Sequence, residues 1–329
     1  MASAYQAARQ RAASIDRSSR GRIVVSGKDR ASYLQGLLTN DIVALTAGSG
    51  CYSAYLTPQG RMISDLYVYE LGDVILLGLP SAGAKDTVLA KLDQFIFSED
   101  VQLGDVTEAF AQISVVGPAA AQVVAALVNV SAERLAALAE HGCLRGAIAG
   151  GAAIVTRVTD TGEPGFDLDI EGARRSALTD GLAAAGLVQL DADTADVLRV
   201  EAGVPVFHRD MDEETIPLEA GIEARAINMN KGCYVGQEVI VRVLHRGHGR
   251  VAKKLVGLTI DGDAVPARGT IVKSAEKEIG EVTSAVRSMA TGRPIALAYL
   301  QRDFVAPGTA VSIDGTAAAV TPLPFVPRQ

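Results

Sequence analysis

Two strand-turn-strand patterns, each with a helical pattern after it, constrain the fold of this 329-residue chain more than any other feature. Residues 51–57 and 61–70 are rich in β-forming side chains and flank a Pro-Gln-Gly segment with the chemistry of a tight turn. Residues 153–159 and 166–170 repeat this arrangement. Helical patterns follow at residues 84–96 and 173–185. We therefore predict two lobes with a similar order of elements.

The last part of the chain has a different pattern. Beyond about residue 250, short β runs are separated by Gly, Pro and Asp at turn positions. Several short strands at such spacing are typical of a small barrel or sandwich. We predict an α+β protein with a two-lobed core over residues 1–249 and a separate β domain over residues 250–329.

Composition restricts the compartment and the partners. The 38 acidic side chains outnumber the 31 Lys and Arg, and this net charge of −7 disfavours a general nucleic-acid binder. The cysteines, Cys51, Cys143 and Cys233, are odd in number and far apart, which is not typical of a secreted disulfide framework. No apolar run is long enough to span a bilayer, and the N-terminus lacks a signal-peptide pattern. We expect a cytoplasmic protein without a membrane partner.

Asp65 is an acid in an apolar pattern. In a strand over residues 61–70 it shares a face with Ile63 and Tyr67. Such a carboxylate lines a cavity, is paired, or lies at a sheet edge in water, because burial without a partner costs several kcal/mol. If Asp65 is desolvated, its pKa is raised, which suits a proton-transfer group.

Asp167 and Asp169 alternate with the apolar residues Phe166, Leu168 and Ile170. Taken alone, this pattern is most typical of a strand with one solvated face. The basic stretch at residues 245–250 is likewise interpreted first as a solvated loop and second as a site for a polyanion or a carboxylate. Its two histidines have no Cys or acid at a zinc-like spacing, and we predict no metal site.

Cys233 lies in the segment Asn-Lys-Gly-Cys-Tyr-Val-Gly-Gln-Glu, which we predict to be a loop before a strand over residues 239–244. Lys231 is close enough in sequence to stabilise a thiolate, and Gln237 and Glu238 supply hydrogen-bonding groups. The alternative is a buried cysteine that acts as a small apolar residue. The polar, glycine-rich neighbours favour a functional thiol, whereas Cys51 and Cys143 lack such neighbours.

Residues 231–238 resemble the K-G-C-Y-x-G-Q-E signature of the YgfZ family of folate-binding proteins and its mitochondrial relatives. This family belongs to the superfamily of the glycine cleavage T-protein, a tetrahydrofolate-dependent aminomethyltransferase. The resemblance extends over nearly the whole chain. It implies a three-lobed α+β fold with a bipartite folate-binding core, a small C-terminal β-barrel, and a bound tetrahydrofolate or one-carbon derivative.

The resemblance also implies roles for individual residues. The proton-transferring aspartate of the transferase falls on Asp65, and its pterin-binding glutamate falls on Asp167. Its folate-contacting arginine falls on Ala195, with Arg199 nearby, and its pocket tyrosine falls on Asp160. The C-terminal tyrosine of the transferase falls beyond Gln329, and these three departures put aminomethyl transfer in doubt. The catalytic residues implied are Cys233, Lys231 and Asp65. The cofactor-binding residues implied are Asp65, Asp167, Arg199, Tyr234, Gln237 and Glu238.

Three functions compete. The leading hypothesis is a tetrahydrofolate-binding accessory protein that serves iron–sulfur client enzymes or cluster-assembly proteins, with Cys233 at the mouth of the folate cavity. The first alternative is a folate-dependent aminomethyltransferase, motivated by Asp65. The second is an RNA-binding module in tRNA modification that uses residues 242–254, which lack the aromatic side chains for base stacking. We therefore do not expect nucleic acid as a partner.

Overall fold

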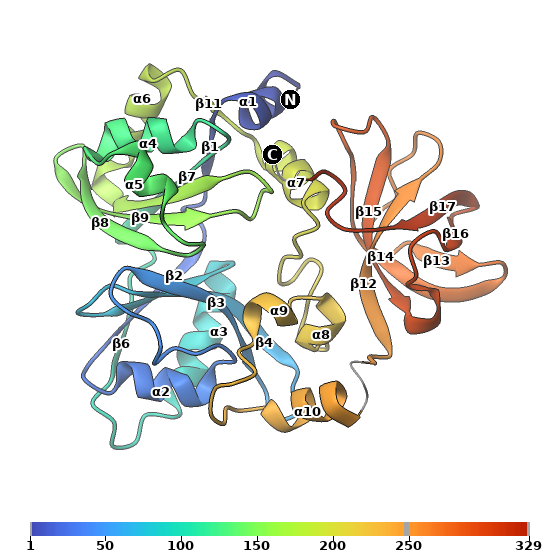
Figure 1. The fold of residues 1–329 in the computed structure, drawn as a ribbon, viewed down its shortest axis with the longest axis horizontal. Coiled ribbons are helices and arrows are strands. Elements are labelled where there is room, and N and C mark those ends of the chain that lie inside the picture. Colours follow the sequence, from blue (N-terminus) through green and yellow to red (C-terminus); the bar gives the residue numbers. More distant parts are fainter. Residues whose placement is uncertain (1, 247–249, 328–329) are drawn as a thin grey trace.

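The computed structural model describes residues 2–246 and 250–327, which form three lobes (Figure 1). Two α/β lobes lie one above the other on one side, and the barrel lies on the other side (Figure 1). The predicted three-lobed α+β fold with a C-terminal barrel is confirmed. Within the described ranges, no helix combines the length and apolar character needed to cross a membrane.

The first lobe is built on a five-stranded sheet of order β3-β4-β5-β2-β6. Strands β3 and β4 form an antiparallel hairpin, and Gly60 in its turn adopts a φ of 75° that glycine tolerates without strain. Leu34 of α2 and Val88 of α3 are fully buried in one apolar core with Leu77 of β5. The elements are β2 (Gly21–Ser26), α2 (Arg30–Leu37), β3 (Ser49–Leu56), β4 (Met62–Glu70), β5 (Ile75–Leu79), α3 (Ala82–Asp93) and β6 (Gln102–Asp105).

The second lobe is built on a six-stranded sheet of order β11-β1-β7-β10-β9-β8. Val124 of α4 and Leu178 of α6 are buried in one core with Leu168 of β10, so the helices cover the apolar face of this sheet. The elements are α1 (Ala2–Gln10), β1 (Ala13–Asp16), β7 (Phe110–Val116), α4 (Ala120–Val128), α5 (Ala132–Ala136), β8 (Cys143–Ile148), β9 (Gly151–Val158), β10 (Gly165–Glu171), the 3₁₀ turn η1 (Gly172–Arg174), α6 (Arg175–Ala184) and β11 (Val188–Gln189).

The polar face of the second sheet is turned toward the first lobe. Asp167 and Asp169 are each only 2% exposed. Arg22 at the start of β2 donates a 2.8 Å hydrogen bond from Nε to Asp169, and Gln112 of β7 donates to both oxygens of the same carboxylate. The interpretation of these two aspartates as a solvated face is therefore wrong. Alternation separates the two faces of a strand, but it does not say what covers each of them.

Short helices connect the core to the barrel. The predicted strand over residues 239–244 is wrong, because this segment continues α10 and then forms a π-helical turn. Its β-branched side chains favour a strand, but Ile240 is fully buried in an apolar cluster with Leu56 and Met62 of the first hairpin, and this packing overrides the local preference. The elements are α7 (Ala192–Glu201), α8 (Pro217–Ala220), α9 (Glu223–Ala226), α10 (Gln237–Val241) and η2 (Arg242–Arg246).

The C-terminal lobe is a closed barrel of order β12-β15-β14-β13-β16-β17. Leu258, Ala298 and Val272 lie in its apolar interior. Closure removes the exposed strand edges that an open sheet would leave. The elements are β12 (Lys253–Ile260), β13 (Ile271–Ser274), β14 (Lys277–Arg287), β15 (Pro294–Gln301), η3 (Arg302–Phe304), β16 (Ala310–Ile313) and β17 (Thr316–Thr321).

Glu201 at the end of α7 forms hydrogen bonds to α1 and to the barrel. Its Oε1 accepts a 2.6 Å hydrogen bond from Ser288 of the barrel, and its Oε2 accepts a 2.7 Å bond from Tyr5 of α1. Arg9 of α1 pairs with Glu201 and with Glu163 of the second lobe. These charges are buried and paired, so this network fixes the second lobe and α7 against the barrel.

Candidate functional site

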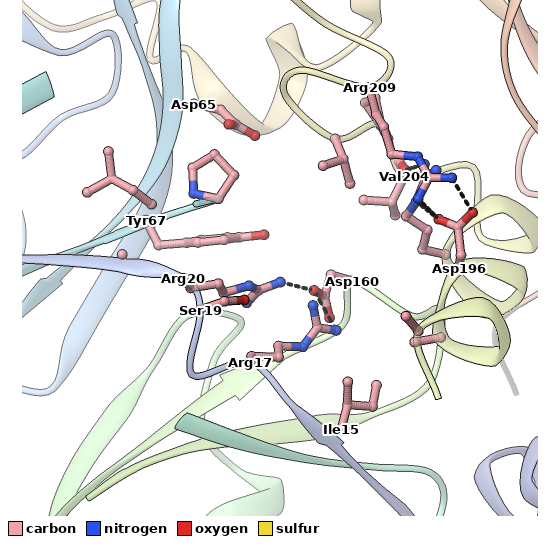
Figure 2. Close-up of a pocket in the computed structure, with 18 of the residues that line it drawn as sticks. Ile15, Arg17, Ser19, Arg20, Asp65, Tyr67, Asp160, Asp196, Val204 and Arg209 are labelled. Carbon is pink, nitrogen blue, oxygen red and sulfur yellow. Dashed lines mark hydrogen bonds and ion pairs between the residues drawn. The ribbon is translucent and has the colours of Figure 1, made fainter. Parts of the chain in front are cut away.

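A cavity of about 300 Å³ with charged side chains on its wall lies between the two sheets, α7 and residues 204–209 (Figure 2). This volume is at the lower end of the range for small-molecule sites. The figure labels six charged side chains on its wall, which are Arg17, Arg20, Asp65, Asp160, Asp196 and Arg209.

Asp65 of β4 is the most deeply buried acid on this wall, at 8% exposed. Its Oδ2 accepts a 2.7 Å hydrogen bond from Tyr52, and its Oδ1 is buried without a partner among the described residues. Burial raises the pKa of Asp65, and the bond from Tyr52 and the charges of Arg20 and Arg225 offset this only in part. The alternative of an edge acid in water is therefore excluded. A carboxylate with a raised pKa is a stronger base than an ordinary aspartate.

Tyr67 lies next to Asp65 on the same strand face, and its hydroxyl is directed toward the cavity (Figure 2). Its ring packs between Tyr52 and the buried His141, with centroid distances of 5.3 and 5.2 Å. Burial raises the pKa of Tyr67 to about 12, so the phenol stays protonated near neutral pH. The wall beside Asp65 is thus an aromatic surface with one hydroxyl at its edge.

Arg20, in the turn before β2, bridges the two lobes. Its guanidinium donates to Asp160 at 2.9 Å and to Asp167 at 3.3 Å. Asp167 also accepts a hydrogen bond from Ser114 of β7 and does not reach the cavity wall. Arg17 forms a second ion pair with Asp160 at 3.0 Å. The acid at position 167, which the resemblance implies as a pterin ligand, is therefore already occupied by side chains of the protein.

Arg199 of α7 reaches the cavity wall, but its guanidinium is engaged within the protein. It donates to Asp196 at 2.6 Å, to Asp210 at 2.7 Å and to Ser284 of the barrel at 2.8 Å. Arg209 donates two hydrogen bonds to the other side of Asp196. These pairs form the wall opposite Tyr67 (Figure 2) and join α7 to the barrel, so cofactor binding by Arg199 remains a prediction.

The amino group of Lys231 is bonded to the backbone at the end of α2. Its Nζ donates to the carbonyl oxygens of Gln35, Leu38 and Asn40 at 2.6, 2.5 and 2.9 Å, at the C-terminal end of α2. Burial lowers its pKa to about 8. Tyr234 is buried in the apolar cluster under the first hairpin. Both side chains therefore anchor the 231–236 segment to the first lobe.

Cys233 is exposed but is not among the residues that line the cavity. Gln237 and Glu238 begin α10, and Glu238 pairs on the surface with Arg242 at 3.0 Å. The prediction that Cys233 lies at the mouth of the folate cavity is wrong for this cavity, because the loop of Cys233 is anchored to the end of α2 and to the hairpin turn. At the N-cap of α10, Gly236 takes a φ of 84°, and a Cβ there would lie 2.5 Å from the carbonyl oxygen of Thr57.

The basic stretch at residues 245–250 lies largely outside the described residues. Residues 247–249 are not described, and neither are the side chains of His245 and His248. No role is assigned to them.

Tyr52, which contacts Asp65, and Arg20 on the wall were missed in the sequence, whereas Asp160 was named only as the position of the transferase's pocket tyrosine. Tyr52 could have been found from the hairpin register, because Tyr52 pairs with Tyr67 and Ala54 pairs with Asp65, which places Tyr52 diagonal to the acid on one face. Arg20 and Asp160 lie in turns of different lobes, 140 positions apart, and no local pattern joins them.

Comparison with known proteins identifies the family. Residues 1–231 match the model of the GCVT N-terminal domain, and residues 253–327 match that of the glycine cleavage T-protein C-terminal barrel domain. Aminomethyltransferases of Streptomyces coelicolor and Rubrobacter xylanophilus are 33% and 34% identical over 99% of this chain, which covers 89% and 86% of their lengths. The crystal structure of the glycine cleavage system aminomethyltransferase T from Bartonella henselae superposes with a TM-score of 0.89 at 23% identity, over 99% of this chain and 90% of that one.

The fold and cavity define a three-lobed α+β protein with a buried carboxylate between two sheets. This chain belongs to the glycine cleavage T-protein family. The predicted T-protein-like fold is confirmed, and a tetrahydrofolate cofactor is consistent with the family.

The leading hypothesis of an iron–sulfur accessory protein is wrong. Relatives at about 33% identity over nearly the whole chain are named aminomethyltransferases, which favours the first alternative. The comparisons support neither iron–sulfur client enzymes nor a role in tRNA modification. The hypothesis relied on the eight residues of the 231–238 segment, whereas the relatives match across all three lobes.

Proposed function

We propose that the protein is a folate-dependent aminomethyltransferase. The observation that carries the proposal is the buried Asp65 on the cavity wall, one of whose oxygens has no partner among the described residues. A group of this kind accepts or donates a proton at an amine held within hydrogen-bond reach. The names of the relatives support the same class of reaction.

The cavity suits a reduced folate in two respects. Free buried acceptors are present at Asp65 Oδ1 and Asp160 Oδ1, and a reduced pterin carries N–H donors at both ends of its ring system. The aromatic wall at Tyr67 offers a surface for a flat ring. When bound, tetrahydrofolate supplies the amine nitrogen that accepts the one-carbon unit.

The protein's own part in the reaction is proton handling and exclusion of water. Tyr52 fixes the Asp65 carboxyl through Oδ2 and leaves Oδ1 without a partner among the described residues. Burial gives Asp65 its raised pKa and keeps water away from the reacting amine. The ion pairs at Arg199 and Arg209 close the side of the cavity toward the barrel.

The departures from the family pattern at Ala195 and Asp160 bear on how folate is held rather than on the proton-transfer group. Within the superfamily, assignment to the YgfZ branch rests on residues 231–238 and stays a prediction. This assignment no longer includes the iron–sulfur role. The predicted cofactor contacts of Tyr234, Gln237 and Glu238 also remain untested by the structure.

An assay with an aminomethylated lipoyl carrier protein and tetrahydrofolate tests the proposal. We expect methylene-tetrahydrofolate and ammonia from the wild-type protein, and a kcat lowered about 100-fold or more in Asp65→Asn, the usual effect of losing a general acid–base group. Thermal unfolding of the variant serves as the folding control. A folded wild-type protein that forms no methylene-tetrahydrofolate with this carrier would overturn the assignment.

A further inference from the structure

We propose that Arg225 of α9 is a positioning residue that acts on Asp65 through the side chain of Tyr52. The inference rests on the proposed function, in which Asp65 transfers the proton, and adds a residue that acts on this acid from outside the cavity. Arg225 is not among the residues that line the cavity. Its effect on the reaction therefore does not require contact with the ligand.

The guanidinium of Arg225 lies over the ring of Tyr52, with 5.1 Å between its Cζ and the ring centroid. The hydroxyl of the same ring donates the 2.7 Å hydrogen bond to Asp65 Oδ2. A cation at this distance is attracted to the face of the ring. A nearby positive charge also polarises a phenol, which makes its O–H a better donor to a carboxylate. The three side chains thus form a line of contacts from cation to donor to acid.

Hydrogen bonds to the backbone hold α9 against the strand that carries Tyr52. The side-chain amide of Asn40 donates to the carbonyl of Tyr52 at 2.8 Å and to the carbonyl of Arg225 at 3.1 Å. Thr39 Oγ1 donates to the carbonyl of Ala226 in the same helix at 2.7 Å. The base of the Arg225 side chain is therefore fixed beside the ring of Tyr52.

The direction of the effect follows from the charges that act on Asp65. Burial raises the pKa of both Asp65 and Tyr52, and the charge of Arg225 opposes burial in each case. Arg20 opposes it at Asp65 as well, but Arg20 is also paired with Asp160. Loss of the Arg225 charge should therefore raise the pKa of Asp65 further.

Other titratable groups lie around this line of contacts. Burial raises the pKa of Tyr67 to about 12, so this phenol stays protonated. Burial acts to raise the pKa of Asp160, but neighbouring arginines outweigh it and lower the pKa to about 2. Glu140 of the second lobe lies 3.6 Å from Nη2 of Arg225. Burial lowers the pKa of His141 to about 4, so activity in acid does not by itself report the state of Asp65. The test must observe the Asp65 carboxyl directly.

NMR titration of the full-length protein with ¹³C-labelled aspartate carboxyl groups observes this acid, and Asp65→Asn identifies its signal. We expect Arg225→Met to move the titration of Asp65 to higher pH, whereas Arg225→Lys, which keeps a cation, should stay nearer to wild type. Arg145→Met removes an ion pair to Asp73 on the surface of the same two lobes and should leave the titration unchanged. Arg225→Gln replaces Arg225→Met if that variant does not fold. An unchanged Asp65 titration in the folded, uncharged variant would overturn the inference.

A double-mutant cycle separates action through Tyr52 from a direct effect of the arginine charge. In the Tyr52→Phe background the hydrogen bond is absent, so Arg225→Met should shift the Asp65 titration by less than about half of its shift in wild type. Equal shifts in the two backgrounds would show that Tyr52 is not the link.

The transferase assay gives a second readout. Because less of the acid is ionised, Arg225→Met should lower kcat/KM on the acidic limb about 2- to 5-fold, the size of one cation–π contact. A folded wild-type protein that forms no methylene-tetrahydrofolate would remove the proposed function, whereas the NMR titration would still decide whether Arg225 acts on Asp65.

Discussion

Tyr52 donates a 2.7 Å hydrogen bond to Asp65 Oδ2 from the neighbouring strand of the first sheet. The bond uses Oδ2 and leaves Oδ1 without a partner among the described residues. Because the bond favours the ionised acid, it lowers the pKa of Asp65 while burial raises it. Tyr52 therefore acts as a positioning residue that tunes the acid.

Replacement of Tyr52 by Phe should raise the pKa of Asp65 further, because the lowering hydrogen bond is lost. If Asp65 acts as a base, activity appears as it is deprotonated, so the acidic limb of the kcat/KM profile should move to higher pH. We expect kcat to fall about 3- to 10-fold, the usual effect of one hydrogen bond. Tyr55→Phe, on the opposite face of the same strand, is the control. An unshifted profile would contradict the role of Tyr52.

Lys231→Met should destabilise the first lobe. The substitution leaves three carbonyl oxygens at the end of α2 without their donor, at a cost of about 2 kcal/mol. Urea unfolding measures the change, and Lys28→Met, which removes an exposed lysine, should change stability by less than about 0.5 kcal/mol. Equal stabilities of the two variants would show that the lysine does not anchor the loop.

Gly236→Ala should be more damaging than Gly292→Ala, although both glycines have positive φ. A Cβ at Gly236 meets the carbonyl oxygen of Thr57 at 2.5 Å, whereas a Cβ at Gly292 meets nothing within 4 Å. Both variants share the conformational cost of about 1 kcal/mol, and we expect the collision to add roughly 1–3 kcal/mol more at Gly236. Thermal unfolding compares the pair, and similar melting temperatures would be inconsistent with tight docking of the loop on the hairpin turn.

His141 should make the protein less stable in mild acid. Burial lowers the pKa of His141 from 6.5 to about 4, so between these values the unfolded chain binds a proton that the native protein does not. Stability is therefore lost as pH falls through this window, by up to about 3 kcal/mol. His141→Phe should flatten this part of the curve of unfolding free energy against pH, whereas His208→Gln, at an exposed histidine, should not. Parallel curves for wild type and His141→Phe would refute the prediction.

Cys233 should react with iodoacetamide in the folded protein at the same rate with and without tetrahydrofolate, because its side chain is exposed and does not line the cavity. Cys143 is buried and its pKa is raised to about 11 by burial, so it should react only on unfolding. Peptide mass spectrometry resolves the two sites. Protection of Cys233 by folate would place the thiol nearer to the ligand than the structure does.

Local patterns predicted the α+β class and the C-terminal barrel, because turn residues and the alternation of side chains act over a few positions. The same alternation showed that Asp65 was out of place among apolar neighbours. Alternation failed where packing between lobes mattered. Residues 239–244 are rich in β-branched side chains, which favour a strand. Ile240 is nevertheless helical, because it packs in the apolar cluster under the first hairpin.

The availability of each acid depended on residues far away in the chain. Asp167 pairs with Arg20, which lies 147 positions before it in the chain. Asp160 keeps one oxygen without a partner among the described residues because Arg17 and Arg20 both pair with its Oδ2. Burial and ion pairing are properties of what lies opposite a side chain, and the amino-acid order near that side chain does not contain this information. The chain alone thus established which residues could carry the chemistry, and the packing of the lobes selected those that face the cavity.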